Sequence, residues 1–235
     1  AIDLVRSFDR LAFYWPGGLG IHAITQRGAP TFGMAVLALI YNSLATALRL
    51  FAGLAVGVTV SVSLAALLGW SRTFRRMFAL PSHIVRMFPL LALAPLFNLW
   101  FGSTERGAIS FIAFASFAIL FVATLTAIAS VPGSYSDYAR SLGASRSRAY
   151  VTVVLPAGLP ALRGGLLLAL GFGWSVAIAA ELVGDSTGLG NIINQAQQFG
   201  RTDTIALVGG FVMLYGALSY RLAARMFDSL VRWAE

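Results

Sequence analysis

The chain has 235 residues, of which 58% are hydrophobic and 11% are charged, and its formal net charge is +8. A soluble domain carries about 25% charged residues, so this composition excludes a water-soluble globule and predicts a membrane protein. All 17 basic residues are arginines that flank apolar stretches, which favours a membrane over a nucleic-acid partner, and the absence of cysteine excludes thiolate chemistry.

Uncharged stretches long enough to cross a bilayer recur along the chain, and a crossing helix needs about 20 apolar residues. We therefore predict an all-α, polytopic membrane protein. Its five transmembrane helices are expected over residues 50–71, 87–104, 107–136, 164–180 and 204–220. The latter part of 28–48 is interpreted either as a helix lying at the membrane interface or as an extension of the first span. Pro89 and Pro95 are expected to bend the second span.

The arginines predict how the chain is oriented. They gather in residues 71–86, in residues 130–163 and in the C-terminal tail, which share one side of the membrane if the five spans alternate. The positive-inside rule makes that side cytoplasmic. Residues 1–30 then lie outside. If the intact protein starts in the cytoplasm, a sixth span is expected before residue 1. Residues 1–235 are expected to form a single transmembrane domain.

A polar segment, residues 134–156, interrupts the apolar sequence on the predicted cytoplasmic side. Its apolar positions recur at roughly helical spacing, which predicts one short amphipathic helix, or two separated near Gly143. These positions are Tyr138, Leu142, Ala149 and Tyr150. Pro156 and Pro160 are expected to end the helix and to redirect the chain into the next span. Periodicity alone also allows a basic loop lying on anionic lipid.

The order of residues in this segment resembles the EAA motif of the permease subunits of ABC importers. That motif reads E-A-A, three residues, glycine, nine residues and I-x-L-P. Gly143 takes the place of the glycine, Asp-Tyr-Ala at 137–139 takes the place of E-A-A, and Val-Val-Leu-Pro at 153–156 takes the place of the ending. Asp for Glu and Tyr for the first Ala are departures from the motif.

Three further stretches look like the nitrate, sulfonate and taurine branch of this family. They are TALRLFAGLAVG (46–57), FPLLALAPLFNLWFG (88–102) and GWSVAIAAELVGDSTGLGNII (173–193). Arg49 and Gly53 match an Arg–three residues–Gly pattern of that branch. Leu167 stands where the branch often has an arginine.

The resemblance implies a permease of the bacterial inner membrane that forms half of a paired channel, as a homodimer. It implies a pair of ABC ATPase subunits that grip the segment 134–156 as a coupling helix, and an extracytoplasmic binding protein that delivers the solute. The residues expected to couple to the ATPase are Asp137, Tyr138, Ala139, Leu142, Gly143, Ala144, Arg146, Leu155 and Pro156. The solute implied is a small oxidised anion such as a sulfonate, taurine or nitrate.

The chain itself is expected to be neither an enzyme nor a cofactor-binding protein, and ATP and Mg²⁺ are expected in the partner ATPase. The sequence has no G-x-x-x-x-G-K-[ST] pattern and no lysine. No pair of histidine and carboxylate residues has the spacing of a metal site. A membrane-embedded enzyme, or a structural membrane subunit without a transport path, is the alternative hypothesis.

Five residues are candidates for the solute path or a gate. Glu181 either serves a gate or subunit contact, or simply ends its span. Arg49 either meets an anionic solute or extends to lipid headgroups. Phe97, Asn98 and Trp174 either line the path or anchor span ends at the interface. The polar residues 184–203 either contact the delivering protein, cap the cavity or form an ordinary loop.

Overall fold

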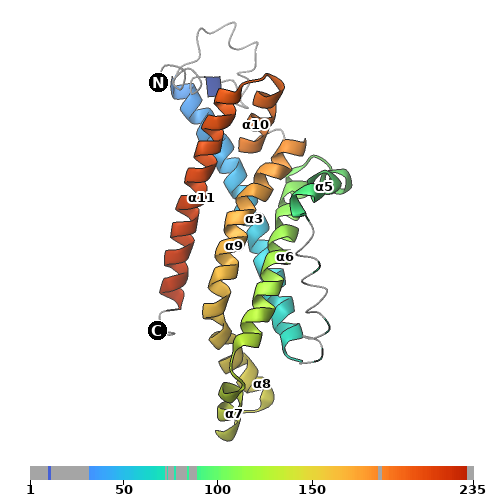
Figure 1. The fold of residues 1–235 in the computed structure, drawn as a ribbon, viewed down its shortest axis with the longest axis vertical. Coiled ribbons are helices and arrows are strands. Elements are labelled where there is room, and N and C mark those ends of the chain that lie inside the picture. The colour runs from blue at the N-terminus through green and yellow to red at the C-terminus, as the bar shows by residue number, and fades with distance from the viewer. Residues whose placement is uncertain are drawn as a thin grey trace. The chain divides into compact units, whose positions relative to one another are not determined.

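The computed structural model describes residues 10–11, 32–71, 73, 77, 84, 89–184 and 187–231. Within these residues the regular structure is helical (Figure 1), which confirms the all-α prediction. The α-helices are α3 (Phe32–Gly69), α5 (Ala94–Phe101), α6 (Glu105–Ser130), α7 (Gly133–Ser141), α8 (Arg146–Ala149), α9 (Leu155–Gly184), α10 (Leu189–Gln198) and α11 (Thr202–Leu230). A 3₁₀ turn at Leu90–Leu93 precedes α5, and a π-helical turn at Tyr150–Val154 precedes α9.

Four helices of the described part are long and apolar enough to cross a membrane. They are α3, α6, α11 and the continuous helical stretch Arg146–Gly184, and they correspond to four of the predicted spans. Helix α3 has 38 residues and begins at Phe32, so the latter part of residues 28–48 extends the first span. Of the two alternatives for that segment, extension of the span is the one confirmed.

The predicted span over 87–104 has a different form. Its described part is the turn Leu90–Leu93 followed by α5, which has 8 residues. Residues 85–88 lie outside the described part. Together the two helical pieces rise only about 20 Å, less than the roughly 30 Å of a bilayer core. Pro95 lies at the start of α5, where its missing N–H is not needed, so the proline starts a new helix instead of bending a long one.

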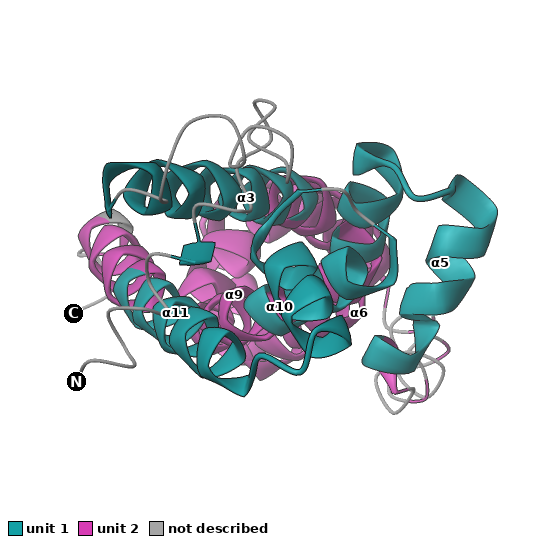
Figure 2. Cartoon of the chain, turned by 90° about the horizontal axis from the view of Figure 1, so that it is seen from above, with its two compact units in different colours: residues 1–53, 91–112, 174–218 teal, residues 54–90, 113–173, 219–235 magenta. Residues whose placement is uncertain are grey.

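The chain divides into two compact units, coloured separately in Figure 2. Unit 1 comprises Ala1–Gly53, Leu91–Ile112 and Trp174–Leu218, and unit 2 comprises Leu54–Leu90, Ala113–Gly173 and Ser219–Glu235. The long helices α3, α6, α9 and α11 therefore each contribute residues to both units. The prediction of a single domain stays a prediction.

The core of unit 1 joins α3, α10 and α11. It contains Ala35 and Leu39 of α3, Leu189 and Ile192 of α10 and Val208 of α11. All five side chains are at most 6% exposed. This packing fixes the start of α10 against the first half of α3.

The core of unit 2 joins α6 and α9, with the second half of α3 packed against them. Its buried members are Ile119, Leu120 and Ala127 of α6 and Leu162 and Ala169 of α9. Small residues allow close approach: a Cβ added to Gly57 of α3 would lie 2.6 Å from the Cβ of Ser116. This is the role of small residues in the packing of membrane helices.

Several residues of the orientation argument lie outside the described part. They are Arg72, Arg75, Arg76, Arg86 and Arg232.

Candidate functional site

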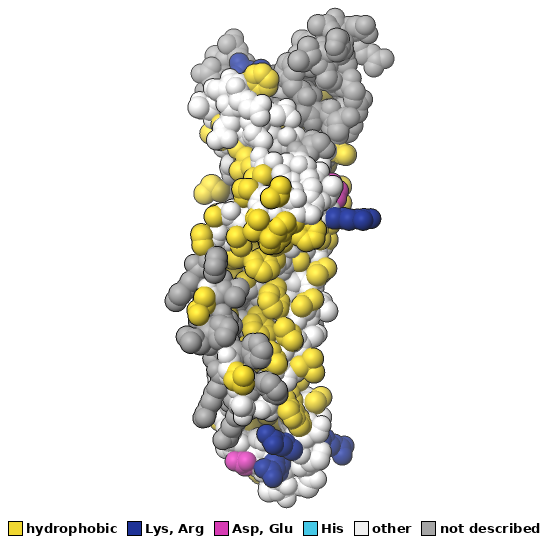
Figure 3. Space-filling view, turned by 90° about the vertical axis from the view of Figure 1, so that its right-hand side faces the viewer, with side chains coloured by type: hydrophobic (Ala, Val, Ile, Leu, Met, Phe, Trp, Pro, Cys, Tyr) yellow, Lys and Arg dark blue, Asp and Glu magenta, His cyan; other side chains and the backbone are white. Residues whose placement is uncertain are grey.

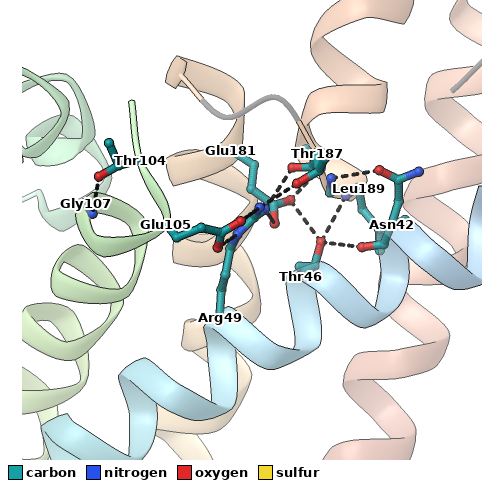
Figure 4. Close-up of polar contacts among 11 residues, drawn as sticks. Asn42, Thr46, Arg49, Thr104, Glu105, Gly107, Glu181, Thr187 and Leu189 are labelled. Carbon is teal, nitrogen blue, oxygen red and sulfur yellow. Dashed lines mark hydrogen bonds and ion pairs between the residues drawn. The ribbon is translucent and has the colours of Figure 1, made fainter. Parts of the chain in front are cut away.

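Arg49 lies in α3, and its guanidinium is enclosed by other parts of unit 1 (Figure 4). Its side chain is 2% exposed. Nε donates to Glu105 Oε2 at 2.6 Å, and Nη2 donates to Glu105 Oε1 at 2.5 Å. Nη1 donates to Glu181 Oε1 at 2.7 Å and to the Thr187 carbonyl oxygen at 2.8 Å, while Nη2 also donates to Thr187 Oγ1 at 2.6 Å. These contacts use all five N–H donors of the guanidinium.

This geometry decides between the two alternatives for Arg49. A side chain that extends to lipid headgroups would direct N–H groups out of the protein, whereas those of Arg49 all point to acceptors of unit 1. The headgroup alternative is therefore wrong. Contact with an anionic solute stays a prediction.

Glu181 lies in the last two turns of α9, and its side chain is 0% exposed. Its Oε1 accepts from Arg49, and its Oε2 accepts from the backbone N–H of Gly190 at 2.9 Å and lies 3.0 Å from Thr46 Oγ1. A buried carboxylate is tolerated only when it is paired and hydrogen-bonded, as here. The alternative that Glu181 is a charge that simply ends its span is therefore wrong.

The first N–H groups of α10 are capped by side chains from other helices. Gly188 N–H donates to Asn42 Oδ1 at 2.8 Å, Leu189 N–H donates to Thr46 Oγ1 at 2.9 Å, and Gly190 N–H donates to Glu181 Oε2. Such groups have no partner within their own helix and need one from elsewhere. Asn42, Thr46 and Arg49 follow one another at helical spacing on α3, so one face of α3 holds both the start of α10 and the Arg49 ion pairs (Figure 4).

The glycines of the GLG sequence make room for Glu181. Gly188 has a φ of 109°, and a Cβ there would collide with the Glu181 carboxylate. A Cβ on Gly190 would lie 2.6 Å from both Glu181 Cβ and the Ile178 carbonyl oxygen. The AAE and GLG sequences that carried the resemblance therefore form one packed structure.

Asn98 and Phe97 lie at a neighbouring contact in unit 1. Asn98 Nδ2 donates to the Val183 carbonyl oxygen in the last turn of α9 at 3.1 Å, and Ser103 Oγ donates to Asn98 Oδ1 at 2.9 Å. Phe97 packs against Phe111 with ring centroids 5.1 Å apart. Both residues line a cavity of about 20 Å³, which holds about one water molecule.

Trp174 lies apart from these contacts. It is 5% exposed and stacks on Tyr215 of α11, with ring centroids 6.1 Å apart. Of the five candidates, the structure thus joins Arg49 and Glu181 directly. The role of all five in a solute path stays a prediction.

Residue-level reasoning missed Glu105, Thr46, Asn42 and Thr187. A signal existed for two of them: Asn42 and Thr46 precede Arg49 by seven and three positions, which makes a polar stripe on an otherwise apolar helix. Polar residues at membrane depth usually face the protein interior. Their partners, more than fifty positions away along the chain, carry no local signal.

The segment 134–156 forms two short helices, α7 and α8, joined at Gly143. Gly143 has a φ of 89°, its N–H donates to the Arg140 carbonyl oxygen at 3.0 Å, and Ala144 N–H donates to the Ala139 carbonyl oxygen at 3.1 Å. This pair of bonds is a Schellman motif, which ends α7 and normally requires glycine. Ser145 then caps α8, because its Oγ accepts from Arg148 N–H at 3.3 Å. The two-helix alternative is confirmed.

The prediction that Pro156 and Pro160 end the helix is wrong. The chain passes from α8 through the π turn Tyr150–Val154 directly into α9, which contains both prolines. Proline cannot donate to the carbonyl four residues earlier, and a π turn is a local widening found where that ladder is interrupted. The helix changes its winding before Pro156 instead of stopping.

The surface of α7 and α8 combines apolar and charged side chains. Tyr138 and Leu142 are 69% and 72% exposed, whereas Ala139 and Ala149 are buried. An open groove runs beside Gly143, and it is lined by Asp137, Arg140, Ser141, Gly143, Ala144, Ser145 and Arg146. Figure 3 shows arginine side chains and an acidic one gathered at this end of unit 2. Leu155 and Pro156, the last of the predicted coupling residues, are half-buried at the start of α9.

Aromatic contacts fix this segment to the end of α3. Tyr150 OH donates to the Ala66 carbonyl oxygen at 2.6 Å, and the ring of Trp70 meets that of Tyr150 edge-on with centroids 5.1 Å apart. The guanidinium of Arg146 lies 5.7 Å from the centroid of Trp70, within the range of a cation–π contact. Within unit 2, α8 and the π turn after it are therefore held to the end of α3 by the side chains of Arg146, Tyr150 and Trp70.

The fold defines a class of protein. A chain of the MetNI methionine ABC transporter, solved in inward-facing conformations, superposes with a TM-score of 0.66 over 83% of this chain and 94% of that chain, at 20% sequence identity. At such low identity the likeness concerns the fold alone, which this chain shares with that chain of an ABC transporter.

The family follows from the sequence. Residues 57–233 match the model of the binding-protein-dependent transport system inner membrane component, and the chain belongs to this family. The taurine transport system permease protein TauC of Escherichia coli is 37% identical over 67% of this chain and 56% of its own length. The putative aliphatic sulfonates transport permease protein SsuC of Bacillus subtilis is 30% identical over 93% of this chain and 79% of its own. The predicted branch and the inner-membrane location are thereby confirmed.

Proposed function

We propose that this chain is the permease subunit of an ATP-driven importer and forms the path of a small solute across the inner membrane. The observation that carries the proposal is the α7–Gly143–α8 structure. A Schellman turn and a serine cap stabilise it locally, it is fixed to α3, and it exposes Tyr138 and Leu142. Exposed apolar side chains beside arginines are typical of a protein interface. Family membership and the fold of the MetNI chain support the proposal.

In this proposal the coupling contact is mechanical. An ATPase subunit on the cytoplasmic side grips α7 and α8, and its nucleotide-driven movement is transmitted to α9 through the continuous helix and to α3 through Tyr150 and Arg146. ATP and Mg²⁺ belong to that partner, since this sequence has no lysine for a P-loop. A second permease copy completes the channel, and an extracytoplasmic binding protein delivers the solute.

The solute proposed is a small oxyanion of the sulfonate type. The names of the relatives TauC and SsuC, taurine and aliphatic sulfonates, support it. A sulfonate group is negatively charged at neutral pH and offers three oxygens to hydrogen-bond donors.

The test is the substitution Gly143→Asp in the permease expressed with its ATPase and binding protein. A side chain at a φ of 89° strains the turn, and a carboxylate adds charge to the groove beside it. We expect loss of ATPase co-purification and at least a tenfold loss of ATP-driven uptake.

Gly133→Asp is the matched control. Gly133 also has no atom within 4 Å of an added Cβ, but it starts α7 at an ordinary φ, where an acidic residue is favourable. Assembly and uptake should stay near wild-type values. Undiminished assembly and uptake in Gly143→Asp would contradict the coupling role.

A further inference from the structure

Arg49 is the one buried arginine among the residues that the structure describes, and its donors divide into two sets. Nη1 and one proton of Nη2 hold Glu181 and Thr187 in the interior of unit 1. Nε and the other Nη2 proton form a parallel pair of bonds to Glu105. We name this second pair the Glu105-facing edge of Arg49.

The side chains of Arg49 and its two carboxylate partners, Glu105 and Glu181, differ sharply in solvent exposure. The side chains of Arg49 and Glu181 are 2% and 0% exposed, whereas that of Glu105 is 61% exposed. Glu105 is the first residue of α6 and follows Gly102, Ser103 and Thr104, which are all exposed. Of the two carboxylates, Glu105 can therefore rotate away into solvent without unpacking a helix, and Glu181 cannot.

Arg49 keeps a charge partner, Glu181, when the Glu105 carboxylate moves away. Arg49 and Glu181 neutralise one another, and the start of α10, which also faces Glu181 through Gly190 N–H, adds a partial positive charge of about half a unit. Among the described contacts, removal of the Glu105 carboxylate takes away one negative charge and the acceptor of Arg49 Nε and of one Nη2 proton. A single anionic group with two oxygens can replace both the charge and the two acceptor atoms.

We infer that the Glu105-facing edge of Arg49 is a binding site for a small oxyanion, and that the Glu105 carboxylate occupies it as a built-in competitor. Sulfonate and carboxylate groups present two oxygens to a guanidinium in the side-on manner in which Glu105 does, and such bidentate pairs are the strong form of charge-assisted hydrogen bond. With Glu105 in place, the edge has no donor for a ligand, so the structure shows the closed form. This inference rests on the proposed function, because it assigns a site to the proposed solute class.

The site is tested by anion binding to the purified full-length chain without its ATPase. Thermal unfolding in non-ionic detergent is followed by intrinsic fluorescence while methanesulfonate replaces chloride at constant ionic strength. A ligand that binds the folded state raises the unfolding midpoint, and the rise grows with the logarithm of the ligand concentration divided by its Kd. Because a competitor lowers apparent affinity by the fraction of time that it occupies the site, Glu105→Ala should bind methanesulfonate about tenfold more tightly than wild type. Glu105→Gln, which keeps the shape of the side chain, should lie between them.

Asp228→Ala is the matched control. Asp228 pairs with Arg163 in the same side-on manner, at 2.7 and 3.1 Å, but the two side chains are 55% and 43% exposed. This variant should respond to methanesulfonate like wild type. An equal response in Asp228→Ala and Glu105→Ala would overturn the inference, because any arginine that has lost its carboxylate partner would then bind the anion. No response in either Glu105 variant would overturn it too.

A lipid phosphate has similar chemistry, so the titration is repeated with short-chain phosphatidylglycerol. Stabilisation of Glu105→Ala by the lipid, without any by methanesulfonate, would overturn the assignment to a solute. The measurement is independent of the coupling test, since failure of anion binding leaves ATPase assembly and its dependence on Gly143 untouched.

Discussion

At the scale of single residues, the pairing of Arg49 with Glu181 determines how both can be buried in an apolar part of the chain. Either charge alone in a buried position costs several kcal/mol, which the Coulomb interaction and the surrounding hydrogen bonds offset only when the geometry is complete. Here both charged groups have further hydrogen-bond partners. Thr187 and Glu105 accept from Arg49, while Thr46 and Gly190 donate to Glu181.

Removal of the buried carboxylate should therefore be severe. Glu181→Ala leaves a buried guanidinium without its inner partner and Gly190 N–H without an acceptor, and we expect the free energy of unfolding to fall by about 3–5 kcal/mol. The measurement is denaturant unfolding of the purified protein in detergent. Asp228→Ala breaks an ion pair whose side chains are 43% and 55% exposed and should change stability little. Similar losses of stability in the two variants would show that the buried Glu181 pair contributes no more than an exposed ion pair.

At the scale of elements, α7 ends because Gly143 adopts a backbone conformation that other residues avoid. Its φ of 89° allows the two backward bonds of the Schellman turn, and nothing within 4 Å would obstruct a side chain. A substitution at Gly143 therefore acts through the backbone of this turn and not through packing inside the chain.

Three substitutions test whether the turn depends on the backbone conformation of Gly143. Gly143→Ala should destabilise the α7–α8 turn by about 1–2 kcal/mol, and Gly143→Asn by less, because asparagine tolerates the left-handed region better. Gly133→Ala, with equal free space and an ordinary φ, should be neutral or slightly stabilising. Hydrogen exchange of the amides of residues 143 and 144 reports the turn directly, and its rate should rise in the order wild type, Asn, Ala. Equal rates in all variants would show that the turn does not depend on glycine.

Most helices could be predicted from the sequence, whereas the contacts between distant residues could not. Apolar length predicted α3, α6, α9 and α11, and the spacing of apolar residues predicted one short helix or two separated near Gly143, because both are local properties. The continuity of the helix through Pro156 was not predictable, since a π turn has no sequence pattern comparable to that of a proline break. The Arg49 cluster needs residues 56 and 132 positions away, and only the tertiary fold brings them together.

At the scale of the whole molecule, charge placement predicts the orientation in the membrane. Arg140, Arg146 and Arg148 lie before α9, and α10 and Asp203 follow it. Helix α9 has 30 residues, about 45 Å at 1.5 Å per residue, which is long enough for one crossing. The positive-inside rule therefore predicts that the α7–α8 end is cytoplasmic and that the α10 end is external.

The sequence allows a clean test, because it contains no cysteine. Ser147→Cys in α8 and Gln197→Cys in α10 each place one thiol at an exposed position. In spheroplasts, a membrane-impermeant maleimide should label Gln197→Cys and spare Ser147→Cys, and inverted vesicles should give the opposite pattern. Both variants should react fully in detergent, which controls for intrinsic reactivity. Labelling of Ser147→Cys in spheroplasts would place α8 outside the cell, where no cytoplasmic ATPase could contact it, and the proposed coupling of ATP hydrolysis to this permease would fail with it.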